Sequence, residues 1–261
     1  MLWCEQGFGD TLLFIRFAIE LKKRGAAQVL LLCQRELADL LKLTPEIDQI
    51  LIEGDELPDF DYQCALLSVP LYLKTSLETI PVEIPFLVPG SDRQQYWSDV
   101  LAKQEGKKVG FNWNGNIKFS RDHFRSVPLE SFLPLGEVKG VQLVSLQQVN
   151  GLEQIEPLKT LWDLFEPGAE YEAETGSFME AAALIQNMDL VITSDTATAH
   201  LAGSLGVPVW ILVSQMPEWR WMLERTDSPW YPTARLFRQE TLGDWKPVIE
   251  EVKSELEQLF Q

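Results

Sequence analysis

A single aspartate stands in a glycine-containing loop near the start of the chain, in the segment Glu5–Asp10 with sequence EQGFGD. Gly7 and Gly9 allow backbone conformations that are closed to other residues, and they let a ligand approach closely. Asp10 falls at or near the N-terminus of the next expected helix, where a capping aspartate contributes about 1 kcal/mol. Its carboxylate could instead take a proton from a hydroxyl group. A pyrophosphate would be repelled by it, so we expect Asp10 to face an acceptor.

A second segment, residues 193–200 with sequence TSDTATAH, lies between an expected strand and an expected helix. If Asp195 caps that helix, the three residues after it form the first turn. Their free N–H groups, the helix dipole and two hydroxyls would make an anion site. The residues concerned are Thr196, Ala197 and Thr198, with His200 about one turn further on. The alternative is an ordinary core helix in which His200 is simply buried.

A third segment, residues 113–126, gathers Lys118, Arg121 and Arg125 in a chain that is otherwise strongly acidic. The planar guanidinium group of arginine can bond two phosphate oxygens at once. We expect this loop to follow a strand at the ligand-binding edge of a sheet. As a solvated loop, it would need no functional explanation.

A fourth segment, residues 217–222 with sequence PEWRWM, places Trp219 and Arg220 just after an expected strand. An indole and a guanidinium group could hold a nucleobase or a sugar. Packing in the core or between lobes is the alternative for the tryptophans.

Composition excludes several classes of protein. The chain carries 39 acidic and 22 basic residues, a net charge of −17, which disfavours nucleic acid as a partner. No apolar run reaches the ~18 residues of a transmembrane helix, and no signal peptide is visible, so we expect a cytoplasmic protein. With only two histidines and no CxxC spacing, we expect no metal site. The match of Asp59 and Asp61 to a metal-binding DxD motif is too short to carry weight.

Strands and helices alternate along the whole chain, which predicts an α/β fold with parallel sheets. We expect two Rossmann-like lobes, residues 1–104 and 105–261, with strand ends facing a common cleft. The last expected helix, 245–260, is predicted to pack back on the N-terminal lobe. Strands are expected at 2–4, 28–33, 49–52, 62–68, 107–113, 141–147, 190–193 and 208–213, and the main helices at 11–23, 92–104, 129–135, 178–187 and 196–205.

These motifs, in this order, resemble glycosyltransferase family 9, the heptosyltransferase-like proteins. The likeness rests on EQGFGD at 5–10, WNGN at 113–116, RSVPL at 125–129 and SDTATAHLAG at 194–203. The segments WRW at 219–221 and SPWYP at 228–232 are typical of the domain that follows tetratricopeptide repeats in bacterial proteins.

The resemblance implies a GT-B fold and a metal-independent, inverting transfer of sugar from a nucleotide-diphosphate donor, with no other cofactor. It implies that Asp10 is the base, that Arg125 or Arg121 holds donor phosphate, and that Asp195, Thr196 and His200 bind diphosphate. Ala197 stands where heptosyltransferases usually have glycine, and its methyl group narrows the approach. The acceptor would be a protein, a glycan or a lipid-linked hydroxyl. A non-catalytic module that binds nucleotide sugar or glycan and an epimerase-like enzyme are the alternatives.

Overall fold

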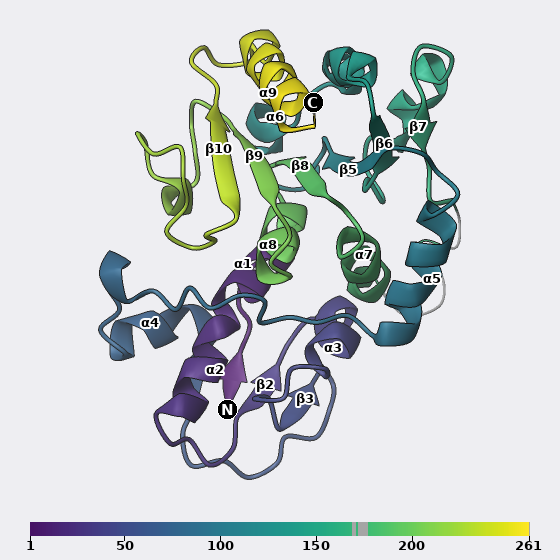
Figure 1. Cartoon of the computed structure of the whole chain (residues 1–261). Helices are drawn as coiled ribbons and strands as arrows, with labels where there is room; N and C mark the ends of the chain where they lie inside the picture. The colour runs from purple at the N-terminus through teal and green to yellow at the C-terminus, as the bar shows by residue number, and fades with distance from the viewer. Residues whose placement is uncertain (169–170, 172–176, 261) are drawn as a thin grey trace.

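The computed structural model describes residues 1–168, 171 and 177–260, and its strands form two sheets (Figure 1). The first sheet has the order β3-β2-β1-β4 and the second the order β10-β9-β8-β5-β6-β7, with parallel pairing throughout. The predicted α/β architecture with two parallel sheets is confirmed. The strands are β1 Leu2–Trp3, β2 Leu30–Leu32, β3 Gln49–Leu51, β4 Cys64–Ala65, β5 Lys107–Asn112, β6 Val141–Ser145, β7 Leu164–Phe165, β8 Leu190–Ser194, β9 Val209–Val213 and β10 Ala234–Arg238.

The helices follow the predicted alternation with local differences. They are α1 Phe8–Phe14, α2 Arg16–Lys23, α3 Arg35–Leu41, α4 Val69–Tyr72, α5 Ser91–Leu101, α6 Asp122–Arg125, α7 Ser177–Ile185, α8 Ala197–Ser204 and α9 Lys246–Leu259. The expected helix 11–23 begins three residues early and divides at Ile15. The expected helix 129–135 is the 3-10 helix η3, Leu129–Glu137, in which Pro134 lacks the N–H group that an α-helix requires. Most of the expected strand 62–68 was wrong, since only Cys64–Ala65 pairs with the sheet.

The order of the strands reverses direction at β1 and again at β5. β1 lies between β2 and β4, and β5 lies between β6 and β8. Ligands of open parallel sheets bind beyond the carboxyl ends of the strands at such a switch point. The segments that follow β1, β5 and β8 contain Asp10, Arg125 and Asp195, respectively. The topology therefore brings three of the predicted site residues to this edge.

The two sheets are joined by direct packing of α1 on α8 and of α3 on α7. Gly9 makes the first contact possible, because a Cβ atom there would lie 2.8 Å from Cδ2 of His200. Arg16 is 2% exposed and ties the lobes further, donating hydrogen bonds to the carbonyls of Pro81 at 2.9 Å and Trp230 at 2.6 Å. The hydrophobic core runs continuously from one lobe into the other.

The close approach at Gly9 gives a stability prediction. Gly9→Ala should lower the free energy of unfolding by about 1–3 kcal/mol, because the buried ring of His200 has little room to move. Gly7→Ala is the matched control in the same loop, since its Cβ atom would meet only Oδ2 of Asp10 at 3.6 Å. Urea denaturation of both variants measures the difference; equal stabilities would contradict the packing described.

Glu180 of α7 joins this helix to α5. Its buried carboxylate accepts hydrogen bonds from Nε of Arg93 at 2.6 Å and Nε1 of Trp97 at 2.7 Å. A buried carboxylate needs such donors, and α5 supplies two of them. Glu180→Ala should therefore cost about 3–5 kcal/mol of stability, because it removes the buried acceptor of the Arg93 and Trp97 hydrogen bonds, as chemical denaturation would show. The boundary between lobes at residue 104 stays a prediction.

The final helix α9 packs on the C-terminal sheet, so the expectation that it returns to the N-terminal lobe was wrong (Figure 1). Its apolar face is buried in the same cluster as β5 and η3. Arg235 of β10 also bonds Glu255 at 2.6 Å. The apolar spacing predicted the helix correctly, but an amphipathic face does not specify which sheet covers it.

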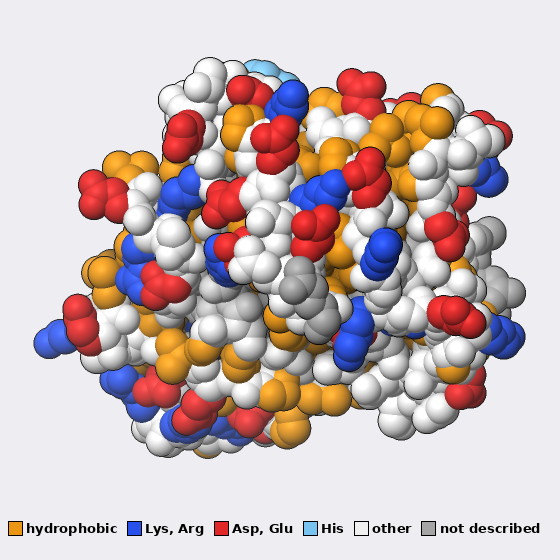
Figure 2. All heavy atoms as spheres, turned by 45° about the horizontal axis from the view of Figure 1, so that its top comes forward, with side chains coloured by type: hydrophobic (Ala, Val, Ile, Leu, Met, Phe, Trp, Pro, Cys, Tyr) orange, Lys and Arg blue, Asp and Glu red, His pale blue; other side chains and the backbone are white. Residues whose placement is uncertain are grey.

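Charged groups of both signs are interspersed on the face of the molecule around α9 (Figure 2). That face offers no broad basic surface to a polyanion. Among the described residues, no helix has the length and apolar character to cross a membrane.

Candidate functional site

Asp10 lies in the first turn of α1 and is fixed by two contacts. Its Oδ2 accepts a hydrogen bond from the backbone N–H of Gly7 at 3.2 Å, and its Oδ1 forms an ion pair with Nη2 of Arg220. The N-cap of α1 is Gly7, so Asp10 reaches back to the helix start from inside the first turn. The alternative that Asp10 is the N-cap residue was therefore wrong, because the cap is Gly7 and Asp10 is the third residue of the helix. The side chain stays 21% exposed, which leaves it accessible to a hydroxyl group.

Arg125 is held across the ends of two neighbouring strands, β5 and β8. Its Nε donates to Oδ1 of Asp122 at 3.0 Å, and its Nη1 donates to the backbone carbonyl of Asp195 at 2.6 Å. The guanidinium group lies 4.7 Å from the ring centre of Phe119. Gly115 leaves the space that the arginine occupies, because a Cβ atom there would lie 2.6 Å from Nη2. The structure therefore brings Arg125 and the Asp195 loop together, and their part in binding a donor stays a prediction.

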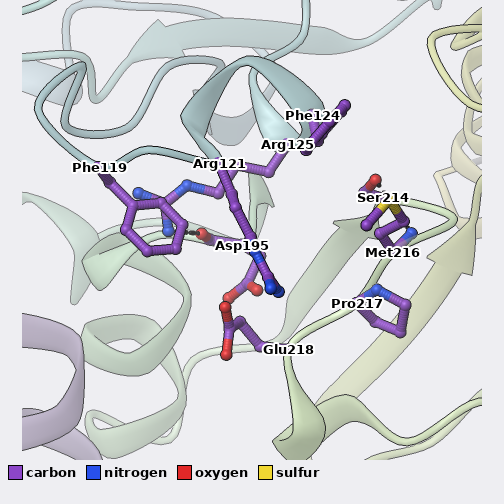
Figure 3. A pocket seen from close by; sticks show the side chains of 9 residues that line it. All are labelled: Phe119, Arg121, Phe124, Arg125, Asp195, Ser214, Met216, Pro217 and Glu218. Atoms are coloured by element: carbon purple, nitrogen blue, oxygen red, sulfur yellow. Dashed lines mark hydrogen bonds between the residues drawn. The ribbon is translucent and has the colours of Figure 1, made fainter.

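A small pocket of about 300 Å³, its mouth included, opens beside this contact (Figure 3). Arg121 and Arg125 enter from the α6 loop, and Glu218 enters from the loop after β9. The side chain of Arg121 extends toward the carboxylates of Asp195 and Glu218 (Figure 3). The wall also contains Phe119, Phe124, Ser214, Met216 and Pro217.

The carboxyl group of Asp195 is almost fully buried in the wall of this pocket. Burial raises its pKa, a contact with the Trp221 side chain and the charges of Arg220 and Arg125 act in the opposite direction, and Glu218 raises it again. The pocket therefore combines cationic groups with carboxyl groups. An anion would be accepted on the side of Arg121 and Arg125.

The N-cap of α8 is Thr196, so the expectation that Asp195 caps this helix was wrong. Thr196 has extended backbone angles, φ −133° and ψ 178°, and the helix begins at Ala197. Its hydroxyl donates to Oδ1 of Asn112 at 3.1 Å and is not free for a ligand. Among the hydrogen bonds of the described residues, none is donated by the backbone N–H groups of Ala197 and Thr198 in the first turn of α8. They and the helix dipole remain available to an anion.

His200 lies inside the contact between α8 and α1, 2% exposed. Its Nδ1 is 3.1 Å from the hydroxyl of Tyr231, and its ring stacks on Trp221 at 5.3 Å. Burial, and then the charge of Arg220, hold the pKa of His200 well below its usual value, so the ring is neutral at pH 7. His200 does not line the pocket of Arg121 and Arg125, and its surroundings are those of a buried residue, the alternative given for it above.

Trp219 and Arg220 belong to the 3-10 helix η6, Trp219–Trp221, and neither lines the Arg125 pocket. Trp219 is 60% exposed and packs edge-on against Trp230, with ring centres 5.8 Å apart. Arg220 is 9% exposed and turns toward Asp10 of the other lobe. Neither residue therefore joins Arg121 and Arg125 in that pocket, although the charge of Arg220 acts on the nearby Asp195.

A larger pocket, about 990 Å³ with its mouth, lies beyond the ends of β6 and β7 and was missed by the sequence analysis. Polar groups and apolar side chains share its lining. Gln147 is fixed there, its Oε1 accepting from the backbone N–H of Trp113 at 3.1 Å. The sequence could have indicated this pocket, because the segment after β6 follows a strand that ends at the same edge of the sheet as β5, the strand that precedes the Arg125 loop. The described lining is Ser145, Gln147, Gln148, Val149, Leu152, Ile155, Glu166, Pro167, Gly168 and Tyr171.

Part of the sequence matches a known family, and the whole chain has a curated relative. Residues 173–241, which include the Asp195 loop and η6, match the model of glycosyltransferase family 9 (heptosyltransferase). The chain is 29% identical to Protein FlbA of Caulobacter vibrioides in an alignment that covers 98% of this chain and 46% of that protein. The chain therefore spans about half the length of the curated relative it matches.

Solved structures share the fold. The E. coli ADP-heptose lps heptosyltransferase II superposes with a TM-score of 0.66 at 15% identity, covering 99% of this chain and 98% of that chain. The E. coli heptosyltransferase WaaC with ADP-2-deoxy-2-fluoro heptose gives a TM-score of 0.62 at 10% identity, covering 98% and 99%. The fold is GT-B-like, as predicted. Together with the family-model match, these neighbours support a glycosyltransferase domain of the heptosyltransferase-like kind.

Proposed function

We propose that this chain transfers a sugar from a nucleotide-diphosphate donor to a hydroxyl group, with inversion and without a metal ion. The observation that carries the proposal is the bond from Arg125 to the carbonyl of Asp195, which sets a guanidinium group beside the start of α8. The leaving diphosphate gains negative charge as the bond between sugar and phosphate breaks. Arg125 and the free N–H groups of Ala197 and Thr198 would stabilise that charge where it develops.

The nucleoside of the donor would occupy the pocket beyond β6 and β7. Val149, Leu152 and Ile155 offer apolar surface to a base, and Ser145 offers a hydroxyl group. Because β5 lies between β6 and β8, a nucleoside placed there can extend its diphosphate across β5 toward α8. Nucleoside diphosphates, and their sugars, should raise the melting temperature, by an increment equivalent to about 2.7 kcal/mol at 100 times Kd.

Asp10 would act as the base on the opposite side of the cleft. A carboxylate has about four lone-pair sites, and Gly7 and Arg220 use two of them. The remaining sites can accept the proton of an acceptor hydroxyl group as it attacks. Positioned general bases of this kind contribute about 10²–10⁴-fold to a rate.

A non-catalytic nucleotide-sugar-binding module is the second candidate, favoured by one observation. Both oxygens of Asp10 already have partners, as expected of a carboxylate that serves only to join the lobes. Binding of donor without turnover of any donor, in the presence of glycan, peptide or lipid-linked acceptors, would favour this alternative. No structural observation favours the epimerase-like alternative.

Metal independence and inversion are separate parts of the proposal. Protein dialysed against EDTA should keep its full transfer rate, and a lost rate that a divalent ion restores would contradict metal independence. The anomeric configuration of the product, read by NMR coupling constants, tests inversion. Three further expectations stay predictions. They are a cytoplasmic location, an acceptor that is a protein, a glycan or a lipid-linked hydroxyl, and tetratricopeptide repeats upstream in a longer protein.

A further inference from the structure

Arg220 is nine-tenths buried and reaches from the C-terminal lobe to Asp10 of the N-terminal lobe. From its place after an expected strand, we expected Arg220 to lie among the residues that hold the donor. In the structure it does not line the pocket of Arg121 and Arg125, although its neighbour Glu218 does. Its Nη2 is paired with Asp10, and its Nε is buried without a hydrogen-bond partner. Arg220 therefore contacts the carboxylate of Asp10 and not the pocket in which Arg121 and Arg125 could hold phosphate.

We propose that Arg220 is a positioning residue, which orients the carboxylate of Asp10 for proton transfer from the acceptor. Gly7 fixes Oδ2 through its N–H group, and Arg220 fixes Oδ1. Two contacts on different oxygens set the plane of the carboxylate, and each oxygen keeps a further lone pair that can accept a proton. The inference rests on the proposed function, because the orientation matters only if Asp10 takes a proton.

Hydrogen bonds fix the backbone around Arg220. Arg238 of β10 donates to the carbonyls of Trp221, Met222 and Arg225, three residues that follow Arg220 in the chain. Met222 takes the backbone angles φ 54° and ψ −163°, which strain a residue with a side chain and require support from its surroundings. The carbonyl of Arg220 itself accepts a hydrogen bond from Nε1 of Trp230 at 3.2 Å.

The aromatic groups beside Arg220 connect the same segment to α1. Trp219 lies 5.4 Å from the Arg220 guanidinium carbon and 6.4 Å from the ring of Phe14. Phe14 follows Asp10 by four residues, so both side chains lie on one face of α1. A displacement of η6 would therefore move the ion pair and the aromatic contact together.

The test separates orientation of the base from donor binding. Arg220→Gln should lower kcat by about 10–100-fold while the Kd for nucleoside diphosphate, measured by calorimetry, stays within twofold of wild type. Arg220→Lys keeps a cation at the same place and should recover part of kcat. Arg24→Gln, at an exposed arginine that pairs with Glu20, is the matched control and should leave both values unchanged.

Each outcome decides the inference. A raised Kd in Arg220→Gln, or an unchanged kcat, would overturn the positioning role while leaving the proposed function standing. A wild-type protein that transfers no sugar would overturn the proposed function and this inference with it. If Arg220→Gln does not fold, Arg220→Lys is measured in its place, and its kcat should fall while the Kd for nucleoside diphosphate stays unchanged. A fall in kcat together with an equal weakening of nucleoside diphosphate binding would assign Arg220 to the donor.

Discussion

An Asp10→Asn variant should lose transfer activity by about 10²–10⁴-fold and still bind the donor. The amide keeps the size of the side chain but cannot take a proton from the acceptor hydroxyl. Donor binding should survive because, in the proposed function, Arg125 and the start of α8 in the C-terminal lobe hold the diphosphate. Steady-state transfer assays, with calorimetric titration of nucleoside diphosphate, measure the two effects separately.

The control for this variant is Asp92→Asn. Asp92 is also an aspartate in a first helical turn, that of α5, and it is exposed. Its replacement should change neither transfer nor binding. If Asp10→Asn turns over as fast as wild type, Asp10 is not the base, and its carboxylate serves only to join the lobes through Arg220.

An Arg125→Gln variant should bind nucleoside diphosphate about 10–100-fold more weakly, because it loses charge-assisted hydrogen bonds worth about 1.5–3 kcal/mol. Its transfer rate at saturating donor should also fall, since the charge on the leaving group would be less well stabilised. Calorimetry gives Kd, and initial rates at several donor concentrations give kcat and KM.

Gly115→Val tests the same site without removing the positive charge of Arg125. The added side chain would occupy the space of Asp122 and Arg125 and would push the guanidinium group away from Asp195. The Kd should rise as it does in Arg125→Gln. A variant with wild-type Kd in both cases would mean that the diphosphate binds elsewhere.

Much of the fold could be predicted from the sequence because its signals are local. Continuous apolar runs such as 190–193 and 208–213 predicted buried parallel strands, which the structure contains as β8 and β9. Their alternation with helices then determined the class of sheet. The meeting of Arg125 with the Asp195 loop followed from topology, since parallel strands bring their carboxyl ends to one edge.

The contacts between the lobes could not be predicted, because they depend on the relative placement of segments far apart in the chain. Nothing local indicated that Arg220 would pair with Asp10, 210 residues away. His200 fitted a ligand-binding helix and a buried core equally well until the position of α1 was known. The cap of α8 is Thr196 and not Asp195, and the Thr196 hydroxyl bonds Asn112 instead of a backbone N–H group of the helix, a contact between distant segments that the local pattern did not indicate.

The most direct test of the account is an NMR titration of the chain with nucleoside diphosphate, following the backbone amides of the α8 start. The amide signals of Ala197 and Thr198, and the Nε–H signal of Arg125, should shift together and saturate at one Kd, because the two amides and the Arg125 guanidinium group would contact the same phosphate groups. Saturable binding that leaves these signals unmoved, or no binding by any nucleoside diphosphate at millimolar concentration, would contradict it.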